Sequence, residues 1–250
     1  YETKNTNYQK LRTVLEPKGR VLWPLLSRWR LGILLWWRLK FGGFTLQELS
    51  QGIGQGQFDS PEGVEFGGHQ GEPQVLDFFR RLQSRVSGYN SVVLLDLHTG
   101  LGDQLQLHVM PADSPEAVHA NLFTRLFGQK CESAARTDMP SENLHATEEA
   151  KQKYVVTTGD DEGFYRTSGD LNNVLPSLLS GSQKCVAVTL EFGTLGSDTG
   201  AKLDTLARVV VENQGRRYGY WHSLVERKVK KMFVELFYPS DLRWRECVLD

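Results

Sequence analysis

The sequence has few cysteines and no pattern that would pair them. Three occur in 250 residues, Cys131, Cys185 and Cys247. Their number is odd, they are widely spaced and no C-x-x-C pair occurs, which argues against a disulfide framework and against a cysteine-based zinc site. This usage favours a reducing compartment, and we expect a cytoplasmic protein. Because the chain begins at Tyr1 rather than at Met, a signal for export stays possible.

The chain also lacks an excess of charge of either sign. It carries 29 Lys and Arg against 30 Asp and Glu, a formal net charge of -1. A protein that neutralises a phosphate backbone or holds an anionic membrane needs an excess of basic charge. The composition therefore predicts neither nucleic acid nor a membrane as a partner.

No apolar run is long enough to cross a bilayer. The densest stretch, 21–41, is rich in Trp and Leu, but Arg28, Arg30 and Arg38 interrupt it. The longest charge-free run is 31–37, whereas a membrane span needs roughly 20 apolar residues. We predict a buried or half-buried helix here, ended by two glycines at 42 and 43.

Two common catalytic signatures are missing as well. No G-x-S-x-G elbow is present, so a serine hydrolase is a poor interpretation. The glycine-rich stretch 52–61 follows a helical pattern and lacks the G-x-G-x-x-G spacing of a phosphate-binding loop. It predicts a turn.

What the sequence does contain is an alternation of strand and helix patterns. Apolar runs at 91–98 and 185–192 predict strands, the first of them central in a parallel or mixed sheet. Helices are predicted from Pro73 to Gly88, at 201–213 and at 224–237, and the polar stretch 129–153 is predicted to be a surface excursion. The order indicates an α/β fold, in which active sites gather at the carboxyl ends of the strands.

Asp96 and His98 stand near the end of the first predicted strand. They are two residues apart, so they share one face of the strand, and the following Thr-Gly-Leu-Gly lets the backbone turn sharply beside them. This pattern suits a strand-end metal ligand with a carboxylate neighbour. A hydrogen-bonded histidine at a strand end is the alternative.

Glu191 interrupts the second apolar strand. An unpaired carboxylate there would cost on the order of several kcal/mol, so it needs a partner or a task. A structural ion pair with Arg208 or Arg217 and a catalytic role are both compatible with the spacing.

The zinc pattern H-x-x-E occurs twice, at His69–Glu72 and at His145–Glu148. Either match could combine with His98 in a three-ligand site. Two matches in one chain show how unspecific this pattern is, and the second falls in the polar excursion.

Five segments carry a resemblance to a known family. They are GQFDSPEG at 56–63, FGG at 66–68, DLHTGLG at 96–102, LEFGT at 190–194 and the stretch 232–244. In that order they resemble an uncharacterised family within the zinc carboxypeptidase superfamily. The DLHT segment is also similar to a strand end in the succinylglutamate desuccinylase and aspartoacylase branch.

The resemblance, which covers nearly the whole chain, implies a mixed, mostly parallel sheet between helices and one zinc ion. In that superfamily an early H-x-x-E and a later strand-end His hold zinc, while a Glu on a further strand is the general base and acid. By resemblance His98 is the later ligand and Glu191 the base. Tyr165 is the candidate to hydrogen-bond the substrate near the oxyanion.

Residues 5–17 resemble the stretch that follows an Asn-Arg-Asn-Phe motif in relatives. Two zinc ligands and the substrate-binding Asn and Arg are therefore expected before Tyr1, and His69 and Glu72 are not the missing ligands. Residues 1–250 would be the C-terminal portion of a single catalytic domain whose first strands are missing.

The expected activity is zinc-dependent hydrolysis of an amide bond in a small peptide or an N-acyl amino acid, with the choice between carboxypeptidase and deacylase left open. The alternative is a noncatalytic binding protein on the same fold. Because catalytic zinc needs three protein ligands, we expect residues 1–250 alone to bind zinc weakly or not at all and to show no turnover. An exposed sheet edge would favour association of the isolated chain.

Overall fold

The computed structural model describes residues 4–68, 73–113, 118–128, 154–159, 161, 164, 171–179, 183–194, 196 and 198–249. The helices are α1 (Thr6–Leu15), α2 (Pro24–Phe41), α3 (Leu46–Gly54), α4 (Pro73–Val86), α5 (Ala120–Phe127), α6 (Leu171–Leu178), α7 (Thr199–Tyr218), α8 (Ser223–Val234) and α9 (Leu242–Leu249). The strands are β1 (Ser91–Gly100), β2 (Leu107–Pro111), β3 (Tyr154–Val156) and β4 (Lys184–Gly193).

The sheet confirms the predicted α/β class, mixed and mostly parallel. Its strand order is β1-β4-β2-β3; β1 is parallel to β4 and β2 to β3, while β2 and β4 are antiparallel. Within the described ranges β1 pairs only with β4, so it is an edge strand, whereas its apolar sequence predicts a central one. The apolar residues Val93, Leu95 and Leu97 are exposed on this strand, so its sequence overstates both its burial and the number of its neighbouring strands.

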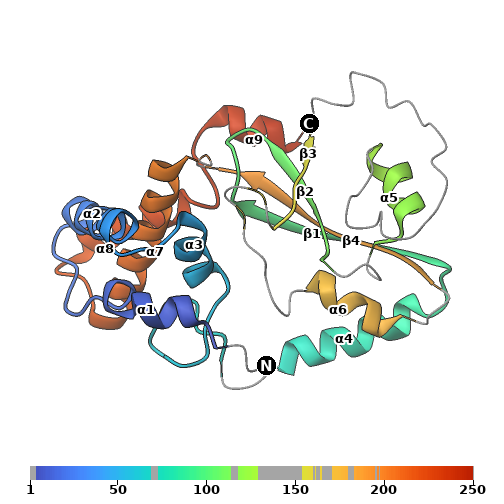
Figure 1. Ribbon diagram of the computed structural model, residues 1–250, viewed down its shortest axis with the longest axis horizontal. Helices are drawn as coiled ribbons and strands as arrows, with labels where there is room; N and C mark the ends of the chain where they lie inside the picture. Colours follow the sequence, from blue (N-terminus) through green and yellow to red (C-terminus); the bar gives the residue numbers. More distant parts are fainter. Residues whose placement is uncertain are drawn as a thin grey trace.

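The described residues form two hydrophobic cores. One is built from α1, α2, α3, α7 and α8, which gather at the left of Figure 1. The other is centred on β4, with α5 and α6 packed against the strand. In Figure 1, α4 and α6 run along one side of the sheet and α9 lies on the other.

The helices end where their packing requires. α2 ends at Gly42, as predicted. α7 runs past the predicted end at 213 and continues through Gly215 to Tyr218. Gly215 is needed for packing instead of for termination, because a Cβ on it would lie 2.1 Å from the ring of Tyr220. α8 ends at Val234, three residues before the predicted boundary.

In the described part of the chain, no helix combines the length and the apolar character needed to cross a membrane.

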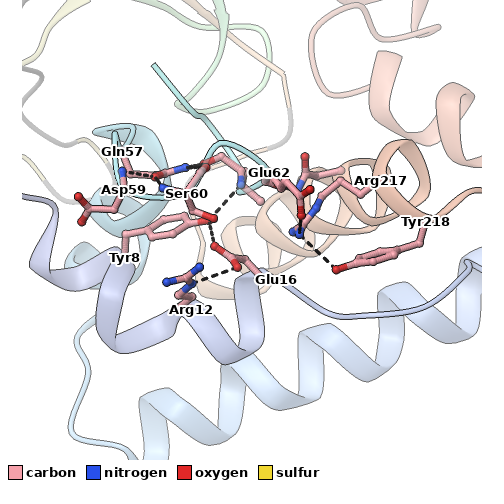
Figure 2. A network of polar contacts seen from close by, with 11 residues as sticks. Tyr8, Arg12, Glu16, Gln57, Asp59, Ser60, Glu62, Arg217 and Tyr218 are labelled. Atoms are coloured by element: carbon pink, nitrogen blue, oxygen red, sulfur yellow. Dashed lines mark hydrogen bonds and ion pairs between the residues drawn. The ribbon is translucent and has the colours of Figure 1, made fainter. Parts of the chain in front are cut away.

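The glycine-rich segment after α3 forms a turn, and a polar network holds it (Figure 2). The Gln57 side chain accepts hydrogen bonds from the Asp59 and Ser60 amides. The Tyr8 hydroxyl of α1 donates to Glu16 at 2.9 Å and accepts from the amide of Val64. Tyr8 and Glu16 belong to or border α1, and the other residues lie in the turn, so the network fixes one against the other.

The same turn is tied to α7. Arg217 forms an ion pair with Glu62 at 2.7 Å (Figure 2). Gly63 approaches Tyr8 so closely that an added Cβ would lie 2.0 Å from the hydroxyl oxygen. The segment 56–63, one of those that carry the resemblance, therefore has a structural task in this chain: it connects α1 to α7.

Candidate functional site

Three neighbouring strands place a row of polar side chains across the sheet. His98 of β1 is the register partner of Glu191 of β4, and Glu191 is in turn the register partner of His108 of β2. Register partners on adjacent strands project from the same face. His98, Glu191 and His108 therefore follow one another across one face of the sheet.

Asp96 and His98 meet as the spacing of two predicts. The Nε2 atom of His98 lies 3.1 Å from Oδ2 of Asp96, and its Nδ1 atom lies 3.8 Å from Oε2 of Glu191. The His98 side chain is 52% exposed and that of Glu191 only 5% exposed. An accessible imidazole thus lies between two carboxylates, one partly and one fully shielded from water.

Glu191 is a buried carboxylate, and no arginine among the described residues forms an ion pair with it. Arg208 pairs instead with Asp204 at 2.8 Å, and Arg217 with Glu62, so the predicted alternative of an ion pair to either arginine is wrong. The Glu191 Oε1 atom accepts a hydrogen bond from the Leu101 amide at 2.8 Å. Burial raises the pKa of Glu191 to about 7, against the smaller lowering effects of the Leu101 amide and His98.

The loop after β1 covers Glu191. It turns through Gly100 and Gly102, both with positive φ. A Cβ on Gly102 would lie 2.4 Å from Nε2 of His108, so the close approach also requires glycine. The Thr194 hydroxyl lies 3.1 Å from the Gly100 carbonyl oxygen and 2.6 Å from that of Leu236. These contacts hold the loop over the carboxylate while leaving His98 accessible.

Sequence reasoning made no prediction for His108, the third residue of this row and the register partner of Glu191. It is buried, its Nδ1 lies 2.9 Å from the Thr157 hydroxyl, and its ring packs against Phe164. Burial lowers its pKa, which favours the neutral imidazole. The available signal was a histidine inside the short apolar run 107–111, a pattern that resembles the interruption of β4 by Glu191.

A pocket of about 300 Å³ opens beside His98 and Glu191. The buried Lys202 of α7 and Glu65 also line it. Glu65 has a φ of 52°, a left-handed conformation that is uncommon for a residue other than glycine and that clusters at functional sites. Partial desolvation raises the pKa of Glu65. The apolar part of the wall comprises Ile53, Leu206, Val209, Leu236 and Phe237.

The described residues supply one corner of a possible metal site. His98 has the donor type and the carboxylate neighbour that suit zinc. Among the described ranges, however, no three His, Cys, Asp or Glu side chains gather to hold a metal. Tyr165 and both H-x-x-E matches, His69–Glu72 and His145–Glu148, lie outside the described residues.

Comparison with known proteins gives one match. The model of the family described as "Protein of unknown function (DUF2817)" matches residues 2–250. Neither the curated proteins nor the solved structures contain a match.

Proposed function

The chain belongs to the DUF2817 family, and we propose that it forms part of the catalytic domain of a cytoplasmic zinc-dependent hydrolase of the zinc carboxypeptidase superfamily. Its reaction is cleavage of an amide bond in a small peptide or an N-acyl amino acid. The observation that carries the proposal is the placement of His98 and Glu191 at the same register near the carboxyl ends of two parallel strands, facing one pocket.

In this proposal His98 would hold the metal through Nδ1. Its Nε2 atom is 3.1 Å from Asp96, so that nitrogen is engaged by the carboxylate, which orients the ring and raises its basicity. Nδ1 lies 3.8 Å from Oε2 of Glu191, and both residues line the pocket. When bound, zinc would polarise the scissile carbonyl and lower the pKa of a bound water toward roughly 7.

Glu191 accepts a proton from water and returns it to the leaving nitrogen. A general base works best when its pKa is near the working pH. In the metal-free chain burial raises the pKa of Glu191 to about 7, and a zinc ion held by the neighbouring His98 would lower it and so favour the carboxylate form that accepts a proton. The hydrogen bond from Leu101 occupies Oε1. Oε2, the oxygen nearer His98, therefore accepts and releases the proton.

Three ligands are needed for catalytic zinc, and the described chain supplies one. We propose that a His and a Glu preceding Tyr1 complete the site, and that Tyr165 assists by hydrogen-bonding the substrate. A noncatalytic binding protein is the competing function. It is favoured by one observation, the lack of a group of three metal-binding side chains within the described ranges.

Zinc stoichiometry tests the proposal. We expect residues 1–250 alone to hold little zinc and a form extended at its N-terminus to hold about one ion per chain. His98→Ala in the extended form should abolish binding, whereas Glu191→Gln should retain the metal. Zinc in residues 1–250 that depends on His69 and Glu72 would contradict the proposed ligands. Zinc absent from every form would favour the binding protein.

A further inference from the structure

A second surface, on α2 and α8, is not used by the proposed hydrolase site. Leu31 and Leu35 of α2 are buried in the helical core, and Arg28 pairs with Asp204 of α7. These contacts fix which side of α2 faces inward. In Figure 1, α2 lies at the left end of the molecule, away from the sheet.

The outward side of α2 is apolar and aromatic. Leu25, Trp29, Ile33 and Trp36 follow offsets of four, eight and eleven, so they form one stripe along the helix, and all are exposed. Trp29 is 68% exposed. Beside the stripe, the rings of Trp37 and Phe41 pack with their centroids 4.5 Å apart. We call these six residues the α2 patch. A sequence prediction of a buried or half-buried helix holds for the inner face only.

The chain around the α2 patch is strongly basic. Residues 18–47 contain six Lys and Arg and no Asp or Glu, so the rest of the chain, with 23 basic and 30 acidic residues, has a net charge of -7. The net charge of the whole chain, from which no membrane partner is expected, hides this local excess. Arg30 and Lys40 are exposed on α2 itself.

A cavity of about 980 Å³ adjoins the start of α2 and extends the basic surface onto α8. Trp23 and Leu25 line it on one side, and Lys228 and Lys231, one turn apart on α8, line it on the other. Both lysines are exposed. Glu235 and Asp241 also line the cavity, so it offers an apolar wall and charges of both signs, with the two lysines on the side of α8.

We propose that the α2 patch, with Lys228 and Lys231, binds the surface of an anionic lipid bilayer, with α2 lying in the plane of the membrane. An apolar face with Trp and Phe, flanked by Lys and Arg, is the pattern of helices that insert into the interface instead of spanning it. Trp favours the level of the lipid headgroups, and basic residues are attracted to anionic lipids. A second copy of the chain fits less well, because it would bring the same positive charge to the contact. This inference is independent of the hydrolase proposal.

Sedimentation with vesicles tests the inference. The probes are vesicles of phosphatidylcholine alone and of phosphatidylcholine with about 30% phosphatidylserine. We expect binding to the anionic vesicles and little to the neutral ones. Raising the ionic strength from about 0.1 M to about 1 M, which shortens the Debye length from about 10 Å to about 3 Å, should weaken the binding.

Two matched double variants locate the contact. Trp29→Ser with Arg30→Glu alters the α2 patch, while Phe78→Ser with Arg80→Glu makes the same kind of change on the exposed side of α4. The first should lower the vesicle partition coefficient about tenfold or more, and the second should leave it unchanged. Circular dichroism checks that both variants fold.

Several results would overturn the inference. The first is that the chain does not bind anionic vesicles, and the second is that it binds neutral vesicles equally well. The third is that the α4 variant loses as much vesicle binding as the α2 variant. A dimer that forms with rising concentration, disappears with Trp29→Ser and does not bind vesicles would assign the α2 patch to a second copy. If an acidic protein binds the α2 patch and vesicles do not, the patch would be assigned to a protein partner.

Discussion

β1 and β4 are parallel, equal in length and paired residue for residue, yet they differ in how far they are shielded from water. β4 is central, and most of its side chains are buried; β1 is an edge of the described sheet, and its Leu95 and Leu97 are exposed. The difference sets the chemistry of the two site residues. On β4, burial raises the pKa of Glu191, whereas on β1 the ring of His98 stays accessible for a ligand.

Two residues that are register partners on neighbouring strands can therefore have different chemical roles. A general base benefits from a desolvated environment, and a metal ligand needs an open approach. Neighbouring strands of unequal burial supply both within one cross-strand pair, with 3.8 Å between the His98 and Glu191 side chains.

The largest expected effect distinguishes Glu191 of β4 from Asp96 of β1. In the zinc-loaded extended form, Glu191→Gln should lower kcat about a thousandfold, because it removes the base while keeping the shape. Asp96→Asn should lower activity about 10- to 100-fold by weakening zinc binding, because Asp96 orients the ring of His98. Hydrolysis of N-acetyl amino acids and N-blocked dipeptides, with zinc titrations, measures both. Equal losses at the two positions would contradict the assigned roles.

The next effect concerns the pH dependence of stability. The pKa of Glu191 is about 7 in the folded chain against 4.5 as its ordinary value, so the neutral form is favoured on folding. Its contribution to stability is fully present below about pH 4.5 and is lost as the pH rises through about 7, a change of about 3 kcal/mol. Urea unfolding of the metal-free chain measures it. Glu191→Gln should flatten the curve; an unchanged slope would show that Glu191 does not titrate in this range.

The smallest effect compares two valines at one register position. Val93 of β1 pairs with Val186 of β4, and they are 43% and 0% exposed. Val186→Thr buries a hydroxyl and should lower the free energy of unfolding by about 2 kcal/mol, whereas Val93→Thr should change it by less than about 0.5 kcal/mol. Chemical denaturation gives both values. A comparable loss at Val93 would mean that β1 is covered in solution.

The sequence was sufficient for the α/β class, the two long strands and the pairing of Asp96 with His98, because each depends on periodicity along one segment. It also singled out Glu191, since a carboxylate stands out in an apolar strand. The register that brings Glu191 beside His98 depends on how strands separated in sequence pair, and spacing alone does not contain that information.

The missed features depend on contacts between distant segments. His108 joins the row of polar residues only because β2 runs antiparallel along the second edge of β4. Gly215 resembles a helix terminator until Tyr220 is seen to pack against it. The strain at Glu65 is a property of backbone dihedral angles, and its residue type gave no sign of it. The sequence also gave no sign that the outward side of α2 is exposed, because Trp and Leu are residue types expected in a core.

The hydroxyl of Thr194 has a single proton, yet two carbonyl oxygens, those of Gly100 and Leu236, lie within reach of it. The two acceptors compete for one donor. The loop over Glu191 and the segment that follows α8 therefore share one donor, at the residue that follows β4. A ligand that displaces the Leu236 carbonyl would tighten the loop over the carboxylate, and one that pulls the loop outward would tighten the turn after α8.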